Sequence, residues 1–277
     1  MKTIVSILAF CWLMAGSRAF AEGIDQYTAL MLHNDGPDGS TTFIDSAGNH
    51  IGANAPVAHG NAQIDALQNK FGTASGLFNA NSLNNYLTLT DHADWNFGNG
   101  NFTIDLWAKF TTVPTRNYNH LVEQWVSNAE RWFFAYVGDG HLYFETVSTF
   151  NNMQVELNKV IATAWQDDTW YHIAIVRNVN TWRLYQNGVQ VGSEVTDTDT
   201  MPDFSSPLYI GPFKEGVFNT DMWLDEVRIS KGIARWTSNF TPPSAPYDST
   251  VIPEPATLLT LGLSIFGISL IKRKRKL

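Results

Sequence analysis

The sequence predicts an all-β protein, built as a jelly-roll sandwich of two antiparallel sheets, on three observations. Short segments rich in Val, Ile, Phe, Trp and Tyr recur through residues 27–247, separated by Gly, Asn, Asp and Pro. Apolar residues in these segments alternate with polar ones, as in strands with one buried face. No segment of this region keeps a helical pattern for more than about two turns. Many short strands joined by turns are typical of sandwiches and jelly rolls.

The strands are expected in the following order. Residues 102–110 alternate strictly, with Phe, Ile, Leu, Ala and Phe at every second position. Residues 131–137 and 141–147 flank Gly-Asp-Gly and predict a hairpin. A second hairpin is expected from 181–186 and 189–191, which turn at Asn187-Gly188. The remaining strands are expected at residues 170–177, 208–210 and 222–229, before Pro242, Pro243 and Pro246 end the series.

The N-terminal end, residues 1–21, has the pattern of a secretory signal peptide. Lys2 gives a positive start, residues 4–15 are apolar, and Ala19-Phe20-Ala21 is a small-x-small cleavage site for signal peptidase. The single cysteine of the chain, Cys11, lies inside this segment. If the segment is removed, the mature chain can form no disulfide, and its stability has to come from its core.

The C-terminal end combines three parts in a fixed order. Residues 248–255 form a linker that contains Pro253-Glu254-Pro255, residues 256–271 are apolar and uncharged, and residues 272–277 are basic. An apolar segment followed by cations is a stop-transfer pattern, with the cations on the cytoplasmic side. The predicted membrane helix has 16 residues, somewhat fewer than the roughly 20 that span a bilayer, and snorkelling lysines can narrow this gap.

This order resembles the PEP-CTERM sorting signal of Gram-negative bacteria. The resemblance implies that the chain is exported and anchored in the inner membrane. It also implies that exosortase then cuts the chain and that the product reaches the cell surface or the extracellular matrix. A plain, uncleaved tail anchor is the alternative.

The mature chain would be strongly acidic. Seven of the 18 Lys and Arg lie in the two terminal signals, whereas all 26 Asp and Glu lie between residues 22 and 255, which leaves a net charge of −15. Such a surface repels nucleic acid and anionic lipid. It is compatible with divalent cations and neutral glycans, or with an acidic surface that has no specific partner.

Residues 22–247 resemble the laminin-G-like domains of the concanavalin A-like lectin/glucanase superfamily. The most typical segments are Thr-Trp-Tyr-His-Ile-Ala-Ile-Val-Arg at 169–177 and Trp-Leu-Asp-Glu-Val-Arg-Ile-Ser at 223–230. Further matching segments are 29–36 with 43–48, 71–78 running to 86–89, 101–110, 184–188, 232–236 and 240–243. The resemblance implies two stacked antiparallel sheets. It leaves the function open, because lectins, adhesion modules and glycosidases share this fold.

The sequence gives little sign of an enzyme. Glycosidases of this fold carry a Glu-x-Asp-x-x-Glu strand, which brings two carboxylates to one sugar bond, and no such strand occurs here. Strand alternation is expected to send the adjacent Asp225 and Glu226 to opposite faces, and the other glutamates of the strand region, Glu123, Glu130, Glu145 and Glu156, occur singly. Serine-nucleophile elbows, phosphate loops and zinc-helix motifs are also absent from the sequence.

The resemblance implies a Ca²⁺ site where the first and last strands meet. Ca²⁺ takes about six to eight oxygen ligands, several of them carboxylates. Asp35 and Asp38 in an Asn-Asp-Gly-Pro-Asp-Gly turn, together with Asp225 on the last strand, are the expected ligands. The alternative is that these aspartates only accept backbone hydrogen bonds. A second acidic loop, with Asp197, Asp199 and Asp203, is expected to be solvated.

Ten tryptophans invite a glycan-binding interpretation, although most should lie in the core. Trp107, on the polar face of its strand beside Asp105, is the tryptophan expected to be exposed, and Trp125 and Trp132 lie near expected loops. Asp105, Trp107, Trp125 and Trp132 are therefore the candidate ligand-binding residues. We expect a surface or matrix protein that binds polysaccharide or protein. The alternatives are a structural envelope protein without a discrete ligand and a glycosidase with an unrecognised site.

Overall fold

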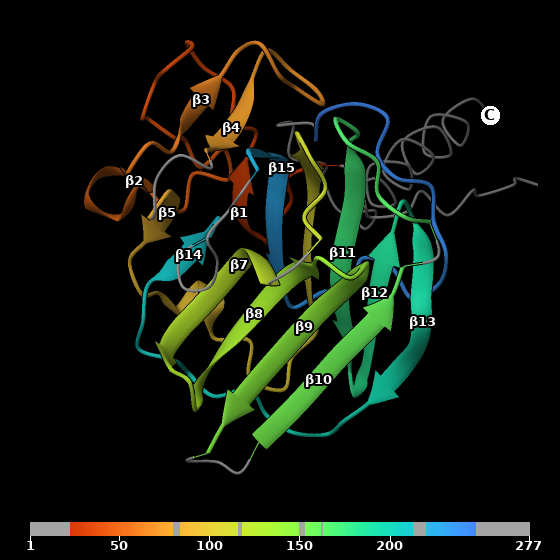
Figure 1. The fold of residues 1–277 in the computed structure, drawn as a ribbon. Coiled ribbons are helices and arrows are strands. Elements are labelled where there is room, and N and C mark those ends of the chain that lie inside the picture. The colour runs from red at the N-terminus through yellow and green to blue at the C-terminus, as the bar shows by residue number, and fades with distance from the viewer. Residues whose placement is uncertain are drawn as a thin grey trace, which may run out of the picture.

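The structure is a computed structural model that describes residues 23–79, 84–115, 118–149, 153–161, 163–212 and 220–247. Two antiparallel sheets lie face to face (Figure 1), which confirms the predicted sandwich. The predicted signal peptide, sorting motif, membrane helix and basic tail lie outside the described residues, and so do Ala19, Ala21, Pro253, Glu254 and Pro255. Within the described part of the chain, no helix has the length and hydropathy needed to cross a membrane.

The first sheet has eight strands among the described residues. In spatial order, seven of them are β13 (Val189–Thr196), β12 (Thr181–Gln186), β11 (Tyr171–Asn178), β6 (Phe102–Phe110), β15 (Met222–Lys231), β4 (Ser75–Phe78) and β3 (Gln63–Asp65). The eighth, β1 (Thr28–Leu32), pairs with the second half of β15, on the edge whose first half pairs with β4. β6 and β15 are therefore central strands with partners on both sides.

The second sheet has seven strands among the described residues. Their order is β10 (Met153–Val160), β9 (His141–Ser148), β8 (Glu130–Val137), β7 (Tyr118–Ser127), β14 (Leu208–Ile210), β5 (Tyr86–Leu89) and β2 (Val57–His59). Two short 3-10 helices, η1 (Gly52–Asn54) and η2 (Ala93–Trp95), lie in the connections. Figure 1 shows β7, β8, β9 and β10 side by side in front of the first sheet.

The core fills the space between the sheets, as the alternating pattern predicts. In β6 the residues at 102, 104, 106, 108 and 110 all belong to it, and all are fully buried. Trp132 and Trp182 enter the same core from the second and first sheets. Each large apolar side chain that leaves water contributes about 1.5–3 kcal/mol to folding.

The Asn187-Gly188 turn forms as the sequence predicts. Gln186 pairs with Val189 across a two-residue turn, and the φ angles of Asn187 and Gly188 are +49° and +76°. A Cβ atom on Gly188 would lie 1.9 Å from the carbonyl oxygen of Phe240, so this position requires glycine. The turn is thereby fixed against the C-terminal segment that crosses it.

A β-bulge in β15 corrects the expectation for Asp225 and Glu226. The register shifts between Asp225 and Arg228, and Glu226 has a φ of +51°. Leu224 and Val227 both belong to the core, whereas the two acidic residues between them do not. The alternation expected from an unbroken strand is therefore wrong here, because the extra residue of the bulge lets both carboxylates leave the core side.

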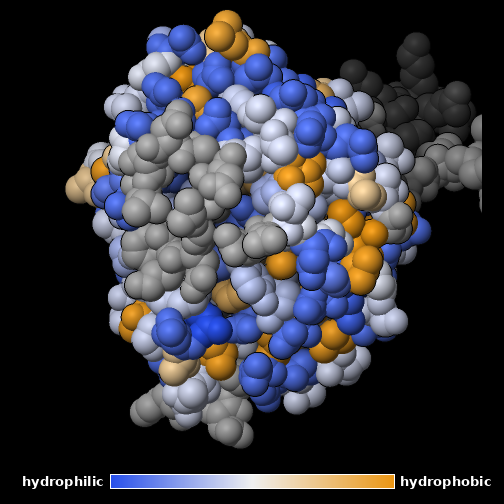
Figure 2. Space-filling model, in the orientation of Figure 1, coloured by the Kyte–Doolittle hydropathy of each residue, from blue (hydrophilic) through white to orange (hydrophobic). Residues whose placement is uncertain are grey.

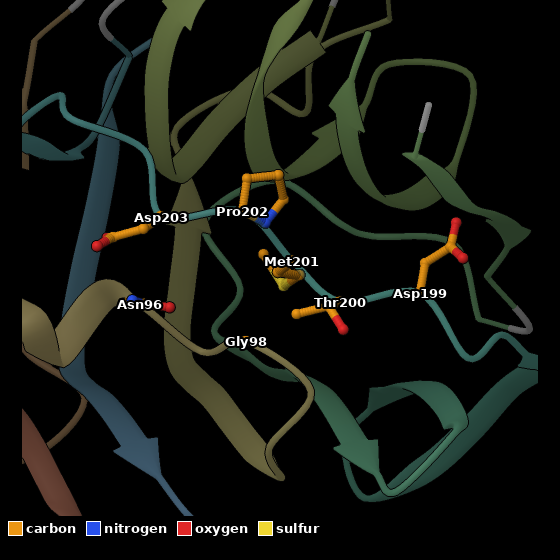
Figure 3. A pocket seen from close by; sticks show the side chains of 7 residues that line it. All are labelled: Asn96, Gly98, Asp199, Thr200, Met201, Pro202 and Asp203. Atoms are coloured by element: carbon orange, nitrogen blue, oxygen red, sulfur yellow. The ribbon is translucent and has the colours of Figure 1, made fainter. Parts of the chain in front are cut away.

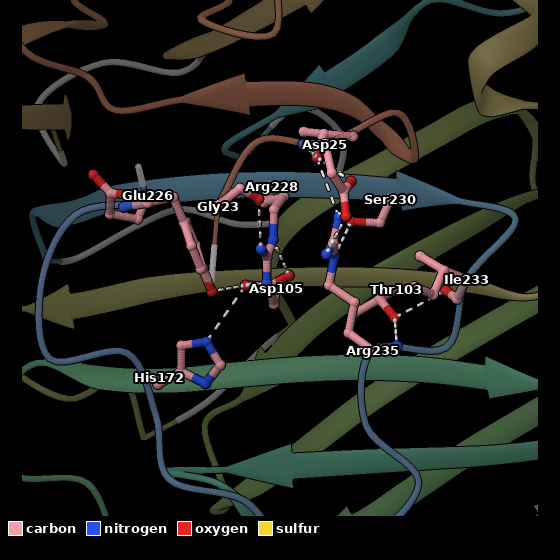
Figure 4. A network of polar contacts seen from close by, with 12 residues as sticks. Gly23, Asp25, Thr103, Asp105, His172, Glu226, Arg228, Ser230, Ile233 and Arg235 are labelled. Atoms are coloured by element: carbon pink, nitrogen blue, oxygen red, sulfur yellow. Dashed lines mark hydrogen bonds and ion pairs between the residues drawn. The ribbon is translucent and has the colours of Figure 1, made fainter. Parts of the chain in front are cut away.

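The outer face of the first sheet is covered by the chain itself. Trp236 and Phe240, from the C-terminal segment, pack with Tyr185. Beneath them a buried ion network joins β6, β11 and β15 to the segments before β1 and after β15 (Figure 4). Arg228 Nε donates to Asp105 Oδ1 at 3.0 Å, and Arg235 donates to Asp25 at 2.8 Å.

The carboxylate at the centre of this network stays ionised. Burial alone would raise the pKa of Asp105, but the charge of Arg228 and hydrogen bonds from His172 and Tyr247 lower it to about 2. Tyr247 also donates its backbone N–H to Glu226 Oε2 at 2.8 Å. The network thus ties the end of the described chain to the two central strands.

Candidate functional site

The aspartates predicted to bind Ca²⁺ are held by backbone N–H groups. Asp35 Oδ1 accepts hydrogen bonds from the N–H groups of Thr73 and Ala74, and Asp38 Oδ1 accepts one from Ala66. Both aspartates are exposed. They anchor the loop after β1 to the segments that follow β3 and precede β4.

Asp225 is buried beneath the same region. Its carboxylate accepts from the N–H groups of Lys70, Phe71 and Glu226 at 2.7, 3.1 and 2.8 Å. Burial, and secondarily the charge of Glu226, raises its pKa to about 7. Asp35, Asp38 and Asp225 do not form a group whose carboxylate oxygens converge within 4.8 Å. The Ca²⁺ site therefore stays a prediction.

The predicted ligand-binding residues separate into three environments. Asp105 and Trp107 lie on the covered face of the first sheet with 0% and 6% exposure, so the expectation that Trp107 is exposed is wrong. The Trp107 ring is covered by the Lys70 ammonium group, which lies 4.0 Å from the ring centroid. Trp132 lies in the core and donates to Gln124 Oε1 at 2.9 Å. Ligand-binding roles for these three stay predictions, and their burial argues against them.

Trp125 lies on the outer face of the second sheet, which carries the polar and aromatic groups best suited to a ligand. The strand register aligns one row of residues across this face. We call it the glutamate row, and its members are Glu156, Glu145, Phe133, Glu123, Tyr209 and Thr88. Because β-strands lie about 4.8 Å apart, the row spans the width of five strand spacings.

Aromatic rings stack beside this row. His120 and Tyr143 flank Phe133 with centroid distances of 4.4 and 5.4 Å and nearly parallel planes. Arg131 lies over Trp125 at 4.7 Å. The faces of these rings stack against one another rather than being open to a ligand. The cluster they form is mostly buried.

The carboxylates of the row differ in how well they are paired. Glu145 forms an ion pair with Arg131 and accepts from the Tyr143 hydroxyl at 3.0 Å. Burial, together with the charge of Glu145, raises the pKa of Tyr143 well above its usual range. Glu123 Oε2 lies 2.8 Å from His120 Nδ1, whereas its buried Oε1 has no hydrogen-bond partner among the described residues.

Two adjoining hollows open at the end of this face. One, of about 430 Å³, lies between the segment 199–203 and the residues Asn96 and Gly98 (Figure 3). The other, of about 610 Å³, is lined by Val126, Glu130, Ser148, Thr149 and residues 202–205. Pro202 and Asp203 line both hollows, so the two hollows adjoin, and we refer to them together as the depression.

The side of the molecule that carries the second sheet is predominantly polar. Among the coloured atoms of Figure 2, apolar residues form separate spots between hydrophilic ones rather than one broad patch. Three carboxylates, on Glu130, Asp199 and Asp203, line the hollows together with the hydroxyl groups of Ser148, Thr149, Thr200 and Ser205. The Glu130 carboxylate already accepts hydrogen bonds from the hydroxyl groups of Ser148 and Thr149 at 2.6 and 3.3 Å. The carboxylates of Asp199 and Asp203 and the hydroxyl groups of Thr200 and Ser205 are the groups that this surface offers to a polar ligand. The acidic loop at 197–203, expected to be merely solvated, was the only sequence signal for it.

Two family models match the chain. A model described as the concanavalin A-like lectin/glucanases superfamily matches residues 80–235, which is more than half of the sequence. A model of the PEP-CTERM protein-sorting motif matches residues 251–276. Both resemblances expected from the sequence are thus confirmed, and the sorting motif implies export. No protein with a curated description matches the sequence.

Solved structures share the fold at low sequence identity. The binding domain of Paraclostridial Mosquitocidal Protein 1 is 18% identical with a TM-score of 0.60, and the match covers 76% of this chain and 50% of that one. The binding domain of botulinum neurotoxin DC, solved with rat synaptotagmin II, is 15% identical with a TM-score of 0.56, and the match covers 77% of this chain and 50% of that one. A structure of botulinum neurotoxin type C, whose cell entry depends on interaction with two ganglioside molecules, is 15% identical with a TM-score of 0.56, and the match covers 76% of this chain and 50% of that one. The chain spans about half the length of these domains.

Proposed function

The chain belongs to the concanavalin A-like lectin/glucanases superfamily, and from this premise we propose that its exported domain binds a neutral or basic glycan without turnover. The binding site of this proposal is the depression formed by the two adjoining hollows at the end of the second sheet. The observation that carries the proposal is the lining of this depression by carboxylates and hydroxyl groups.

The lining suits sugar hydroxyls. A carboxylate accepts hydrogen bonds from two neighbouring hydroxyl groups, and charge-assisted bonds are stronger than neutral ones. Val126, 49% exposed, and Pro202 add an apolar surface on which the C–H side of a sugar ring can rest. Because the depression is shallow and open, we expect weak binding, about micromolar to millimolar. Many copies on one surface would raise the effective affinity by avidity.

The charge of the site indicates which glycans it favours. Asp203 is exposed, and burial together with the charge of Asp203 raises the pKa of nearby Asp91. The mature net charge of −15 acts in the same direction. Both effects disfavour uronic-acid or sulfated polysaccharides and favour neutral or amino sugars.

Binding without turnover follows from the environment of the glutamates. Glu123 is fully buried, and Glu145 is engaged by Arg131 and Tyr143. One pair keeps the glycosidase alternative testable. Glu145 and Glu156 face each other across β9 and β10. Two opposed glutamates on one face are the arrangement from which a pair of carboxyl groups about 5–5.5 Å apart, as in retaining glycosidases, can be built.

The structural relatives are consistent with a binding role. The binding domain of botulinum neurotoxin DC was solved in complex with rat synaptotagmin II, and cell entry of botulinum neurotoxin type C depends on interaction with two ganglioside molecules. At 15–18% identity these matches support the fold alone, so protein binding is kept as the alternative outcome of the experiment.

The experiment uses the full chain in detergent, immobilised and exposed to neutral, amino-sugar and acidic polysaccharides. We expect binding to the first two classes, weakened several-fold by Asp203→Asn. The matched control is Asp139→Asn, which removes an exposed carboxylate at the opposite end of the β8–β9 hairpin and should leave binding unchanged. Released reducing ends are measured in parallel. Release that Glu156→Gln abolishes would establish the glycosidase alternative, and no binding by any polysaccharide would refute the proposal.

Processing is tested separately. We propose that exosortase removes the tail, so the mature protein should begin near Glu22 and end near Pro255. Intact-mass measurement of surface material from the native cell checks both ends. A species that retains Lys272 to Lys276 throughout growth would contradict the proposed cut and support the tail anchor.

A further inference from the structure

A cluster of two histidines and one aspartate lines neither hollow and takes no part in the proposed function. His50 ends the loop that follows β1, while His92 and Asp94 lie at the start of η2. One ligand atom from each residue lies within 4.8 Å of the other two. Among the residues that the structure describes, this is the only group of three or more His, Cys, Asp or Glu side chains that meets this criterion.

His50 is oriented by a second carboxylate behind it. Its Nδ1 lies 2.9 Å from Asp45 Oδ2, and its ring stacks on Trp95 at 4.7 Å. The Asp45 carboxylate is fixed in turn by backbone N–H groups of Met31, Ala47, Asn49 and His50. Because an ionised carboxylate only accepts, Nδ1 carries the proton and donates it to Asp45.

In the neutral imidazole this arrangement leaves Nε2 with a lone pair directed toward the cluster. The Asp45 and Asp94 carboxylates outweigh the effect of burial and raise the pKa of His50 to about 9, so an ion would displace a proton from Nε2. The side chain has 0% exposure, and Nε2 makes no hydrogen bond although it lies 3.3 Å from Asp94 Oδ2. A buried imidazole nitrogen without a hydrogen bond is costly unless another partner takes the lone pair. A metal ion is such a partner.

The distances fit a four-coordinate metal. Asp94 Oδ2 lies 3.3 Å from His50 Nε2 and 3.2 Å from His92 Nδ1. With metal–ligand bonds of about 2.0–2.1 Å, a tetrahedral zinc site places its ligand atoms roughly 3.3–3.4 Å apart. The two histidine nitrogens lie within the 4.8 Å limit of the group. His92 Nδ1 accepts a hydrogen bond from the Asp94 N–H at 3.3 Å, so the exposed His92 ring has to rotate and give up this bond to close the site.

We propose that His50, His92 and Asp94 bind one divalent transition-metal ion of the Zn²⁺ class, with water as the fourth ligand. Asp45 then acts as the outer carboxylate that orients a metal-bound histidine. Two imidazoles and one carboxylate favour such an ion over Ca²⁺, which prefers an all-oxygen shell. The His92 and Asp94 side chains are 43% and 26% exposed, which gives the ion a path from solvent.

The ion would join two parts of the chain that are distant in sequence. His50 belongs to the loop packed against β1 through Asp45, and η2 precedes β6. Since the mature chain is expected to lack disulfides, a metal here supplies a cross-link of another kind. Metal that binds only the folded state also raises thermal stability by mass action.

The experiment measures Zn²⁺ bound to the full chain in detergent, first stripped with a chelator and then equilibrated by dialysis. We expect one ion per chain and a higher melting temperature with Zn²⁺. Co²⁺ provides a second reading, because four-coordinate Co²⁺ absorbs visible light far more strongly than six-coordinate Co²⁺. The same protein titrated with Ca²⁺ should show no binding at this site.

The variants separate binding from folding. His92→Asn removes a ligand, and asparagine retains the capping of η2 that His92 provides to the Asp94 N–H. Outer-shell losses alone weaken metal sites by about 10–100-fold, so this variant and Asp94→Asn should lose at least as much while their apo forms melt like the wild type. The control is His141→Asn, which removes an exposed histidine paired with Asp139 and should bind Zn²⁺ normally. Wild-type binding no tighter than that of His92→Asn, or an equal loss in His141→Asn, would overturn the proposal.

Discussion

The outer faces of the two sheets bury similar side chains but balance their charges differently. On the first sheet, Asp105 is paired with Arg228 and Asp25 with Arg235. On the second sheet, Glu145 pairs with Arg131 and Glu123 lies beside His120, while Glu156 forms no ion pair among the residues that the structure describes. One buried oxygen of Glu123 has no hydrogen-bond partner among the described residues.

This difference in charge pairing distinguishes polar groups that stabilise the fold from polar groups that are available to bind a ligand. A buried charge with its partner is a structural element, because removing either partner leaves the other stranded at a cost of several kcal/mol. A carboxylate that has no cationic partner does not stabilise the folded state in this way. The following predictions test this contrast, from the largest expected effect to the smallest.

Breaking the central ion pair of the first sheet should have the largest effect. Arg228→Met leaves Asp105 buried without its guanidinium partner, so the free energy of unfolding should fall by about 3–5 kcal/mol. Urea unfolding measures this change. The control Arg183→Met breaks a more exposed pair with Glu194 and should cost about 0–1 kcal/mol. Equal losses in the two variants would contradict the assignment of the buried pair to stability.

The protonation of Asp225 should make the free energy of unfolding depend on pH. Its pKa is raised from 3.8 to about 7, so between these values the folded state binds more protons than the unfolded state. The stabilisation is then complete below about pH 4 and is lost as the pH rises through about 7, by an amount on the order of 2–4 kcal/mol. Asp225→Asn should flatten this decline in unfolding experiments from pH 4 to 8. A decline of the same size in the variant would assign it to other groups.

Two tyrosines allow a matched comparison of the faces. Tyr247→Phe removes a hydroxyl donor to Asp105 on the first face, and Tyr143→Phe removes one to Glu145 on the second. Hydrogen bonds to charged groups contribute about 1.5–3 kcal/mol. We expect Tyr247→Phe to lower the free energy of unfolding by an amount within this range. Tyr143→Phe should cost less, because the Glu145 side chain keeps 10% exposure to water whereas that of Asp105 has none. The reverse order in thermal unfolding would reverse our interpretation of the two faces.

The smallest effect should have the opposite sign. Glu123→Gln removes a buried charge but retains an oxygen that can accept from His120. Because burying an ionised group is costly when it is incompletely paired, stability should be unchanged or higher by up to about 1 kcal/mol. Chemical unfolding near neutral pH measures it. A loss as large as that of Arg228→Met would show that Glu123 is structural.

The fold was largely predictable because strand periodicity is a local property. The strands at 102–110 and 181–186 and the Asn187-Gly188 turn occur where the sequence places them. The strand β7 has no expected counterpart, because two register shifts, near Leu121 and Val126, interrupt its alternation. A pattern of period two is visible only in strands without bulges.

The candidate site was less predictable because it depends on register between strands. The glutamates of the row come from β7, β9 and β10, and no spacing along the sequence reveals that they align. The bulge at Glu226 and the covering of Trp107 by Lys70 have the same origin, since both arise from how separate segments meet. The histidine cluster likewise combines two loops that are about 40 residues apart.

The anchoring of Tyr247 has a mechanical consequence. The predicted linker and sorting tail begin one residue later, so any tension along an anchored tail enters the domain at this residue. Tyr247 is bonded to Asp105 on β6 and Glu226 on β15, and its ring lies 3.7 Å from the Arg228 guanidinium. A pulling force is therefore borne by the two central strands of the first sheet, whose many hydrogen bonds share the load. A domain tethered in this way resists being peeled open from its edge when cells are sheared from a surface.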